Sequence, residues 1–226
     1  MKFKTKIEKQ DAGNIGKASF SDEVFSMLSG RAPDQNDSEL FNAILVAAMD
    51  NGIEAPSAFV PRIVASTGNP MNTSLAAGVL AIGDYHGGAV ETCAKYLASA
   101  GDAKLFVSEV LARGERIPGY GHKVYKDVDP RTAAIYSVAE RVGRAGKFMK
   151  MAREIEHELE VQSGKKLPLN IDGAMAAVIC ELNLDPRYGK AIFILSRLPN
   201  MARHVVEELV LDKPYRRLEQ SDISAV

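Results

Sequence analysis

The chain has 226 residues, of which 46% are hydrophobic and 25% charged, a composition typical of a globular protein with a substantial core. Its 28 basic and 29 acidic residues give a formal net charge of -1, which argues against nucleic acid or a membrane surface as the main partner. No apolar run approaches the roughly 18 residues that span a bilayer, and Cys93 and Cys180 lie in apolar helical context, so we expect buried thiols in a cytoplasmic protein.

Helical periodicity runs through almost the whole chain and no alternating strand pattern of useful length occurs, so we expect an all-α fold. A polar, extended segment over residues 1–20 precedes the first helix. Asn36, Asp37 and Ser38 are the expected caps of the second helix, and Pro199 is expected in the first turn of the last one. The predicted helices span residues 21–28, 39–49, 56–65, 71–82, 89–99, 101–112, 132–142, 147–162, 174–182, 187–195 and 199–211.

An irregular, basic segment with a histidine follows the sixth predicted helix. Its proline and glycines prevent a regular helix and let backbone N–H groups approach a ligand closely. The histidine lies in a loop rather than on an apolar helix face, and the cations suit anionic groups, an arginine fork suiting a carboxylate in particular. We therefore expect an anion-binding loop that contains a polar catalytic group. The residues behind this prediction are Pro118, Gly119, Gly121, His122, Lys123, Lys126 and Arg131.

Two further interhelical breaks carry ionisable groups, His86 before two glycines and Asp172 before one. Like His122, each lies where one apolar helix stops and the next begins, and helix ends favour bound anions. If the three converge, the carboxylate can move a proton on carbon while the imidazoles stabilise oxygen. Spacing along the chain leaves that convergence open. We expect no metal site, because neither His-x-x-x-His nor paired-cysteine spacing occurs.

These motifs, in this order, resemble those of the citrate synthase superfamily from about residue 21 to the C-terminus. Residues 119–131 match the Gly-His-Arg-Val-Tyr and Asp-Pro-Arg motif of that family, residues 85–89 match its His-Gly-Gly-Ala loop, and residues 170–173 match the segment with its catalytic aspartate. Residues 64–68 match another familiar stretch, and Ser196, Arg197 and His204 match its late Ser-Arg…Ala-His helix.

The resemblance implies a fold with two helical domains. The larger would consist of residues 1–89 and 176–226. The smaller, residues 90–175, would be inserted into it and carry the loop that binds coenzyme A and the catalytic aspartate. Closure between the two domains would exclude water from the thioester.

Members of that family make or break the bond between the acetyl methyl carbon of acetyl-CoA and the keto carbon of oxaloacetate. The resemblance implies that His86 binds the thioester oxygen and that Asp172 takes or returns the methyl proton. His122 would polarise the oxaloacetate carbonyl, or accept the hydroxyl proton of citryl-CoA in the reverse direction. Arg131 and Arg197 would bind carboxylates.

The resemblance also implies contacts with coenzyme A, which would enter as part of the thioester and not as a permanently bound cofactor. Arg216 or Arg217 in the basic tail would complete the carboxylate clamp across a subunit interface, so we expect a homodimer or a higher homo-oligomer. The implied coenzyme A contacts are Pro118, Gly119, Tyr120, Gly121 and Lys126.

Two features distinguish this chain from a full-length citrate synthase. It lacks most of the N-terminal helices, and in this and in its last residues, 215–224, it resembles citryl-CoA lyases and the C-terminal lyase module of ATP-citrate lyase. His86 is instead synthase-like, since those lyase modules tend to have an aromatic residue there. Asn51 stands where both branches have a histidine that contacts the oxaloacetate part, so substrate binding is weaker or the keto acid is different.

Three functions follow, in order of preference. The first is a citryl-CoA lyase that forms acetyl-CoA and oxaloacetate, with a separate citryl-CoA synthetase as a possible partner. The second is a short citrate synthase that condenses acetyl-CoA with oxaloacetate or a related 2-keto acid. The third is a non-catalytic paralogue that binds acyl-CoA or a partner subunit, for which Asn51 is the only support.

Overall fold

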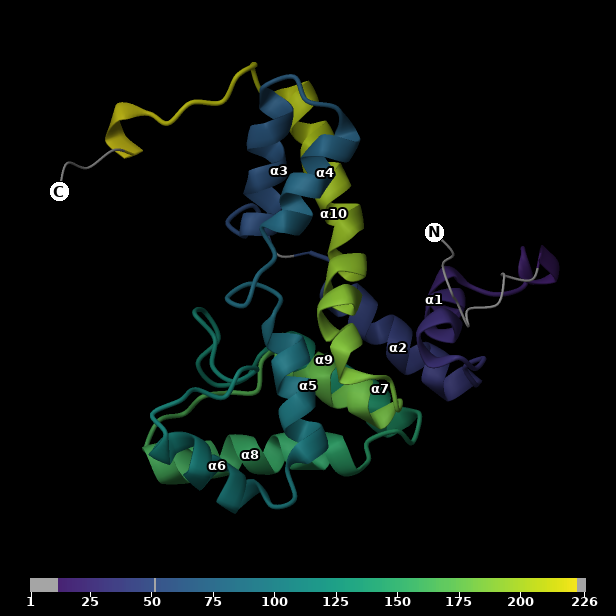
Figure 1. The fold of residues 1–226 in the computed structure, drawn as a ribbon, viewed down its shortest axis with the longest axis vertical. Coiled ribbons are helices and arrows are strands. Elements are labelled where there is room, and N and C mark those ends of the chain that lie inside the picture. The colour runs from purple at the N-terminus through teal and green to yellow at the C-terminus, as the bar shows by residue number, and fades with distance from the viewer. Residues whose placement is uncertain (1–11, 51, 223–226) are drawn as a thin grey trace, which may run out of the picture.

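The computed structural model describes residues 12–50 and 52–222, and these residues form ten α-helices and three short 3-10 helices without a strand. The predicted all-α class is therefore confirmed. Figure 1 shows the arrangement. The helices are α1 (Phe20–Ser29), α2 (Gln35–Ala47), α3 (Pro56–Ser66), α4 (Met71–Leu80), α5 (Ala89–Ser99), α6 (Ala103–Ala112), α7 (Pro130–Arg141), α8 (Lys147–Ser163), α9 (Ile171–Glu181) and α10 (Gly189–Leu211).

Most helix ends lie within a few residues of the predicted ones, because glycine, proline and short polar side chains mark them. The cap of α2 was predicted wrongly. Asp34, and not residues 36–38, is the N-cap, and its carboxylate accepts a hydrogen bond of 2.8 Å from the Asp37 backbone N–H. An N-cap side chain accepts a hydrogen bond from a backbone N–H two or three residues later, as Asp34 does from Asp37. Residues 36–38 cannot make this contact with the Asp37 N–H.

Two helices are longer than predicted. Helix α9 begins three residues earlier, since the Asn170 side chain accepts hydrogen bonds from the backbone N–H groups of Asp172 and Gly173. Asp172 thus lies in the first turn of a helix and not in a loop. Helix α10 runs unbroken through Pro199, which was expected to start a separate helix. Ser196 and Asn200 on either side of the proline are buried, so tertiary packing outweighs the roughly 3 kcal/mol cost of an internal proline.

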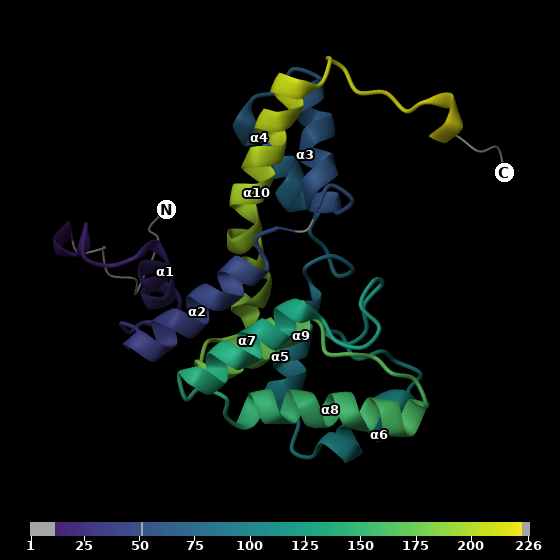
Figure 2. The same ribbon diagram turned by 180° about the vertical axis from the view of Figure 1, so that it is seen from behind.

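The main body of the molecule surrounds α9, with α5, α7 and α8 packed against it (Figures 1 and 2). Nine of the eleven residues of α9 are buried, among them Met175 and Ile179. Cys93 on α5 and Cys180 on α9 are free and buried, as predicted. We call α1, α2, α5–α9 and residues 189–198 of α10 the body.

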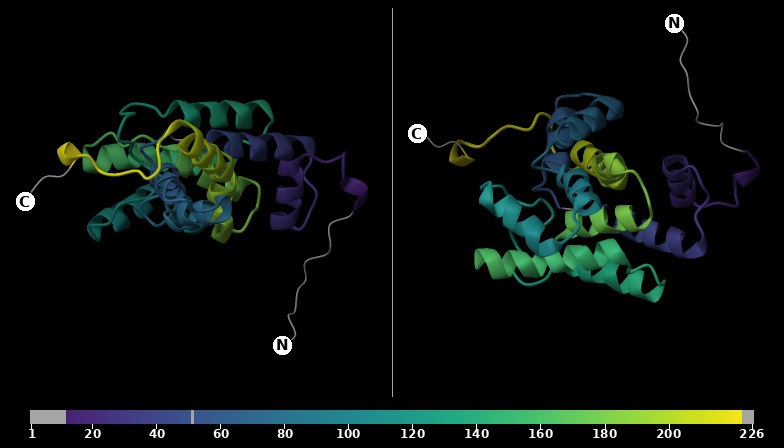
Figure 3. Two further views of the ribbon diagram at one scale, coloured as in Figure 1. Left: turned by 90° about the horizontal axis from the view of Figure 1, so that it is seen from above. Right: turned by 60° about the horizontal axis from the view of Figure 1, so that its bottom comes forward.

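The remaining helices form a separate projection, which we call the arm: α3, α4 and residues 199–211 of α10. All three pack on one another and rise from the body (Figure 1), and the right-hand view of Figure 3 shows the same separation. The tail after Leu211 leaves the arm at its tip (Figures 1 and 2). In the described part of the chain, no helix is long and apolar enough to cross a membrane.

Candidate active site

His86 lies in the connection between α4 and α5, at the base of the arm. Its Nε2 atom is 2.8 Å from the Ser57 hydroxyl and 3.4 Å from the Ser57 backbone nitrogen. A backbone N–H can only donate, so Nε2 is the acceptor and the neutral ring carries its proton on Nδ1. Burial, together with the positive charge of Arg197, lowers the pKa of His86 and keeps the ring neutral. The N–H donor of the neutral ring is therefore at Nδ1.

Arg197 on α10 is only 2% exposed and forms no ion pair within the described residues. Its Nε atom donates to the Ala48 carbonyl at 2.9 Å, Nη1 donates to the Ser57 hydroxyl at 3.4 Å, and its guanidinium lies 4.8 Å from the Phe193 ring centroid. Burial lowers the pKa of Arg197 to about 10, an effect that the negative charge of Asp172 opposes. A buried cation without a carboxylate partner favours an anionic ligand.

His122 has its Nδ1 atom fixed by two backbone N–H groups, those of Val124 at 3.0 Å and Tyr125 at 3.1 Å. The proton of the neutral ring is therefore on Nε2, which lies 3.3 Å from Nη2 of Arg131. Burial and the charges of Arg131 and Lys126 lower the pKa of His122, against the effect of Asp129. Two donors that face each other in this way are suited to share one oxygen atom of a ligand.

Asp129, the first residue of the Asp-Pro-Arg motif, is fully buried and holds this part of the site together, a role that we did not predict from the sequence. Its carboxylate accepts hydrogen bonds from Nε and Nη2 of Arg131, at 3.0 and 2.8 Å, and from the Ile171 backbone N–H at 3.1 Å. Burial alone would raise the pKa of Asp129, but the contacts with Arg131 outweigh it and the pKa is lowered. The charged carboxylate thus joins the first turns of α7 and α9.

Asp172 lies beside these groups in the first turn of α9. Its carboxylate accepts no hydrogen bond from any described residue, and burial raises its pKa to about 6, although Arg131 and Arg197 act in the opposite direction. Gly173 holds this turn against the loop: a Cβ atom on it would meet the Gly119 carbonyl oxygen at 2.5 Å. A carboxyl with this pKa can both take and return a proton near neutral pH.

A cavity of about 340 Å³ is lined by His122 and Arg131 and also by Asp50 and Gly52. The Asp50 carboxylate accepts a hydrogen bond of 3.0 Å from the Asn200 side chain. Asn51, the predicted substrate contact between Asp50 and Gly52, lies outside the described residues. The size and the cations of this cavity suit a small carboxylate.

A second cavity, of about 610 Å³, is also lined by His122. Of the predicted coenzyme A contacts, Tyr120, Gly121 and Lys126 line it, whereas Gly119 is buried against Gly173 and Pro118 does not line it. The loop is fixed by hydrogen bonds from Gly121 N–H to the Pro168 carbonyl and from the Asn170 amide to the Gly121 carbonyl. Three basic residues that the sequence reasoning did not assign to coenzyme A also line this cavity: Arg116, Lys123 and Lys165.

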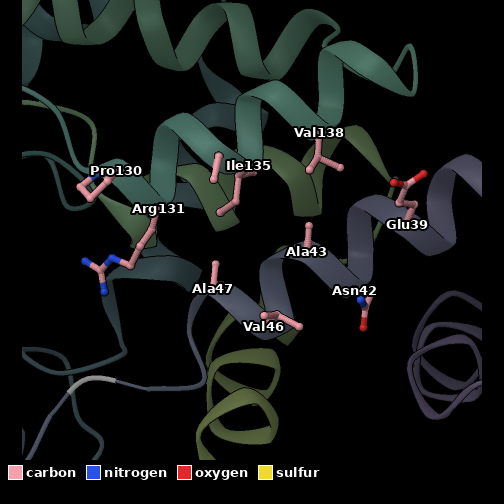
Figure 4. Close-up of a pocket in the computed structure, with 10 residues that line it drawn as sticks. Glu39, Asn42, Ala43, Val46, Ala47, Pro130, Arg131, Ile135 and Val138 are labelled. Atoms are coloured by element: carbon pink, nitrogen blue, oxygen red, sulfur yellow. The ribbon is translucent and has the colours of Figure 1, made fainter.

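A third cavity, of about 530 Å³, lies between α2 and α7 and is mainly apolar. Figure 4 shows Ala43 and Ala47 of α2 facing Ile135 and Val138 of α7 across it, with Arg131 at the end near the active site.

Among the described residues, no group of three or more His, Cys, Asp or Glu side chains is placed to hold a metal ion.

The two tail arginines are not near His86, His122 and Asp172 in the same chain. Arg216 is bound at the tip of the arm, where Nε and Nη2 donate to the Glu208 carboxylate at 2.8 and 2.7 Å. Arg217 forms no ion pair in the described part of the chain and lies 5.9 Å from the Tyr215 ring centroid.

Residues 2–218 match the family model described as citrate synthase, C-terminal domain. "Citrate synthase 2" of Bacillus subtilis is 32% identical over 188 residues, which are 80% of this chain and 50% of that protein. The chain thus spans about half the length of the curated relatives it matches.

Solved structures that are similar over most of this chain include those of two lyases. The citryl-CoA lyase of Hydrogenobacter thermophilus has a TM-score of 0.93 and 38% identity, over 99% of this chain and 94% of that one. The ATP citrate lyase of Methanothrix soehngenii, in complex with citrate and coenzyme A, has a TM-score of 0.81 over 92% of this chain and 37% of that one. At 22% identity, this second likeness supports the fold alone.

Proposed function

The chain belongs to the citrate synthase family, and we propose that it is a citryl-CoA lyase, which cleaves citryl-CoA to acetyl-CoA and oxaloacetate. The observation that carries the proposal is that the groups of the candidate site are connected. His86 and Arg197 both contact the Ser57 hydroxyl. Arg197 and Arg131 both act on the pKa of Asp172, which is about 6. His122 and Arg131 line the smaller cavity, and His122 also lines the larger one. The similarity to the lyase of Hydrogenobacter thermophilus, over nearly the full length of both chains, supports cleavage as the reaction.

In the proposed reaction, the citryl part of the substrate occupies the smaller cavity. Its hydroxyl oxygen would lie between Nε2 of His122 and the Arg131 guanidinium, which stabilise the oxygen as it loses its proton. The hydrogen bonds of His122 favour this donor role over the alternative in which the ring accepts the hydroxyl proton, because Nε2 already carries one. Arg197 would bind a carboxylate of the citryl group.

Breaking the carbon–carbon bond leaves the electron pair on the acetyl part as an enolate. Nδ1–H of His86 would stabilise the enolate oxygen. The Asp172 carboxylate would take the hydroxyl proton as the carbon–carbon bond breaks and would then give this proton to the methyl carbon. The hydroxyl loses one proton and the methyl group gains one, so cleavage involves no net proton change. Asp172 without a hydrogen-bonded partner is suited to this transfer.

Coenzyme A would bind as part of the thioester in the larger cavity, with its phosphates near Lys126 and the neighbouring cations Arg116, Lys123 and Lys165. No permanently bound cofactor is needed for this chemistry.

We further propose that the chain works as a homodimer or a higher homo-oligomer, in which Arg216 or Arg217 completes the carboxylate clamp of another copy. A separate synthetase would supply citryl-CoA. Closure of residues 90–175 onto the rest of the chain would exclude water.

The second candidate is a citrate synthase that condenses acetyl-CoA with oxaloacetate or a related 2-keto acid. The identity of 32% with the "Citrate synthase 2" of Bacillus subtilis favours it, as does the intact His86. One site serves both directions, so the direction depends on relative rates.

Two assays with purified protein test both candidates. Cleavage is measured as oxaloacetate released from citryl-CoA, and condensation as free thiol released from acetyl-CoA with oxaloacetate and several other 2-keto acids. We expect faster cleavage than condensation. Faster condensation with any keto acid would favour the synthase. If Asp172→Asn matches the wild-type protein in both assays, or if neither activity occurs, the chemistry proposed for this site is wrong.

A further inference from the structure

The segment that leads into α9 runs beside part of the wall of the larger cavity (Figures 1 and 2). We call this part of the wall, residues 119–123, the cavity loop. Two backbone hydrogen bonds join the segment and the loop. The Gly121 N–H donates to the Pro168 carbonyl at 2.7 Å, and the Asn170 N–H donates to the Gly119 carbonyl at 3.0 Å. The two stretches therefore form a short antiparallel pair.

The backbones of the cavity loop and of the first turn of α9 also touch directly. A Cβ atom on Gly173 would lie 2.5 Å from the Gly119 carbonyl oxygen, and a Cβ atom on Gly119 would lie 2.8 Å from the Gly173 Cα atom. Only glycine fits at both places, so no side chain separates the two backbones. Movement of one is therefore passed on to the other.

The Asn170 side chain joins the same two parts. Its amide nitrogen donates to the Gly121 carbonyl at 2.8 Å. Its amide oxygen accepts hydrogen bonds from the N–H groups of Asp172 at 3.0 Å and Gly173 at 3.2 Å. A carbonyl can only accept and a backbone N–H can only donate, so just one orientation of the amide makes all three contacts.

The position of the Asp172 carboxylate depends on this turn of α9, because the carboxylate accepts no hydrogen bond from a described residue. The turn is held by two side chains. Asp129 accepts from the Ile171 N–H at 3.1 Å, and Asn170 accepts from the next two N–H groups. Of these two side chains, only that of Asn170 also forms a hydrogen bond with the cavity loop in the described part of the chain.

We infer that Asn170 is a positioning residue that sets the place of the Asp172 carboxylate according to the place of the cavity loop. The inference rests on the function proposed above, in which the thioester would lie along this loop and Asp172 would transfer a proton. Asn170 does not line the larger cavity and acts only through Asp172. A thioester seated against the loop thereby aligns the carboxylate with the carbon that receives the proton.

Two variants separate the two contacts of the Asn170 side chain. Asn170→Ser keeps a capping oxygen for α9 but is too short to reach the Gly121 carbonyl, so kcat for cleavage of citryl-CoA should fall by about 5–10-fold. Asn170→Ala loses both contacts and should lower kcat by about 10²-fold, the effect of a small misplacement of a catalytic group. The change in KM should be smaller than the change in kcat. Wild-type kcat in both variants overturns the inference.

The matched control is Asp102→Ala, which removes the N-cap of another helix of the body. The exposed Asp102 side chain accepts a hydrogen bond of 2.8 Å from the Leu105 N–H at the start of α6. Its loss should lower the free energy of unfolding much as the loss of the α9 cap does, but it should leave kcat unchanged. An equal loss of kcat in Asp102→Ala would mean that general destabilisation explains the Asn170 variants, and the inference would be wrong.

The route through Asp172 is tested with a double variant. If Asn170 acts only through the Asp172 carboxylate, Asn170→Ser should lower the residual activity of Asp172→Asn by less than about twofold, because the group to be positioned is already absent. A further 5–10-fold loss in that background, as large as the loss in wild type, would show that Asn170 acts on another group.

Amide hydrogen exchange, followed by mass spectrometry on the free protein, tests the link without any substrate. Asn170→Ser should speed exchange in residues 119–123 and leave residues 171–174 protected, whereas Asn170→Ala should speed exchange in both. Unchanged exchange of the cavity loop in both variants overturns the link. Cleavage by the wild-type protein alone tests the proposed function, so failure of that function and failure of this inference are distinguishable.

Discussion

The interiors of the body and the arm differ in their share of charged side chains, because the body buries Asp37, Asp129 and Arg197 within a large apolar core. In the body, α9 is buried along almost its entire length with apolar and small residues, among them Met175, Val178 and Ile179. In the arm, the buried set includes Arg62, His204 and Glu208. A body of this kind gains its stability from burying apolar surface. The arm bears the desolvation cost of its charges.

The chemistry is expected to depend on the body, and the largest predicted effect tests this. In Asp172→Asn the side chain keeps its size but cannot transfer a proton to or from carbon, so kcat for cleavage should fall by about 10²–10⁴-fold. Coenzyme A binding, measured by calorimetry, should stay close to wild type, because the cavity with Lys126 is unchanged. A similar loss of kcat without a loss of helical structure in Leu105→Asp, a surface variant of the body, would contradict the assignment.

The next effect concerns the charge cluster of the arm. Glu208→Ala removes one partner that Arg62 and Arg216 share, while Arg62 keeps Asp212 at 2.9 Å and Glu207 at 3.3 Å. The loss of these charged hydrogen bonds in a buried place should lower the free energy of unfolding by about 1.5–3 kcal/mol. In the body, Ile179→Val should lower it by about 0.5–1.5 kcal/mol. Both values come from urea unfolding at one protein concentration.

The control for this prediction is the double variant Arg62→Met/Glu208→Leu. It replaces the buried pair by apolar side chains of similar volume and should recover most of the loss. If Glu208→Ala costs no more than Ile179→Val, the interior of the arm is not held by its ion cluster, and the contrast with the body disappears.

The pH dependence of stability distinguishes an active-site carboxyl from a surface one. Asp172 has a pKa of about 6 when folded and 3.8 as its ordinary value. Because the folded pKa is raised, the contribution of Asp172 to the free energy of unfolding is complete below pH 3.8 and is lost as the pH rises through 6. At 1.36 kcal/mol per pKa unit, the loss is about 3 kcal/mol. Asp172→Asn should therefore become more stable relative to wild type between pH 4 and pH 7.

Asp185 is the matched control, since hydrogen bonds from Arg187 lower its pKa to about 2. A lowered pKa gives a contribution that is present above pH 3.8 and is lost as the pH falls toward 2, the reverse of Asp172. Asp185→Asn should thus follow the wild-type curve between pH 5 and pH 7. Parallel curves for wild type and Asp172→Asn over this range would contradict the raised pKa.

The two regions also differ in how far the sequence could predict them. Helical periodicity and helix-breaking glycines predicted nearly all helices of the body, because both signals come from residues that are close together in the chain. They failed at Pro199, where buried neighbours outweigh the cost of proline, and at Asp172, where Asn170 extends a helix backward. The polar interior of the arm was not predicted, since the partner of Arg62 is 146 residues away in the chain.

The site shows the same limit. The motifs indicated His86, His122, Asp172, Arg131 and Arg197, and the fold brings these five residues together; their roles stay proposals. Ser57 carries no motif, and its contact with His86 spans 29 residues. Arg116 and Lys165 line the larger cavity because two loops meet there, although their basic side chains near the motif were a usable signal. Contacts between distant segments depend on packing, which periodicity does not encode.

The smallest predicted effect compares an exposed ion pair of the body with a buried ion pair of the arm. Lys95 and Glu91 on α5 form an ion pair of 2.6 Å, as short as that of Arg62 and Glu208, but about half of the Lys95 side chain is exposed. Water solvates the charge that remains after Lys95→Ala, so the free energy of unfolding should change by no more than about 0.5 kcal/mol. Moderate salt should abolish even this difference, while the cost of Glu208→Ala should persist, because ions screen a surface pair but not a buried one. A loss above about 1 kcal/mol in Lys95→Ala, measured by urea unfolding, would show that the exposure of a pair does not set its contribution in this protein.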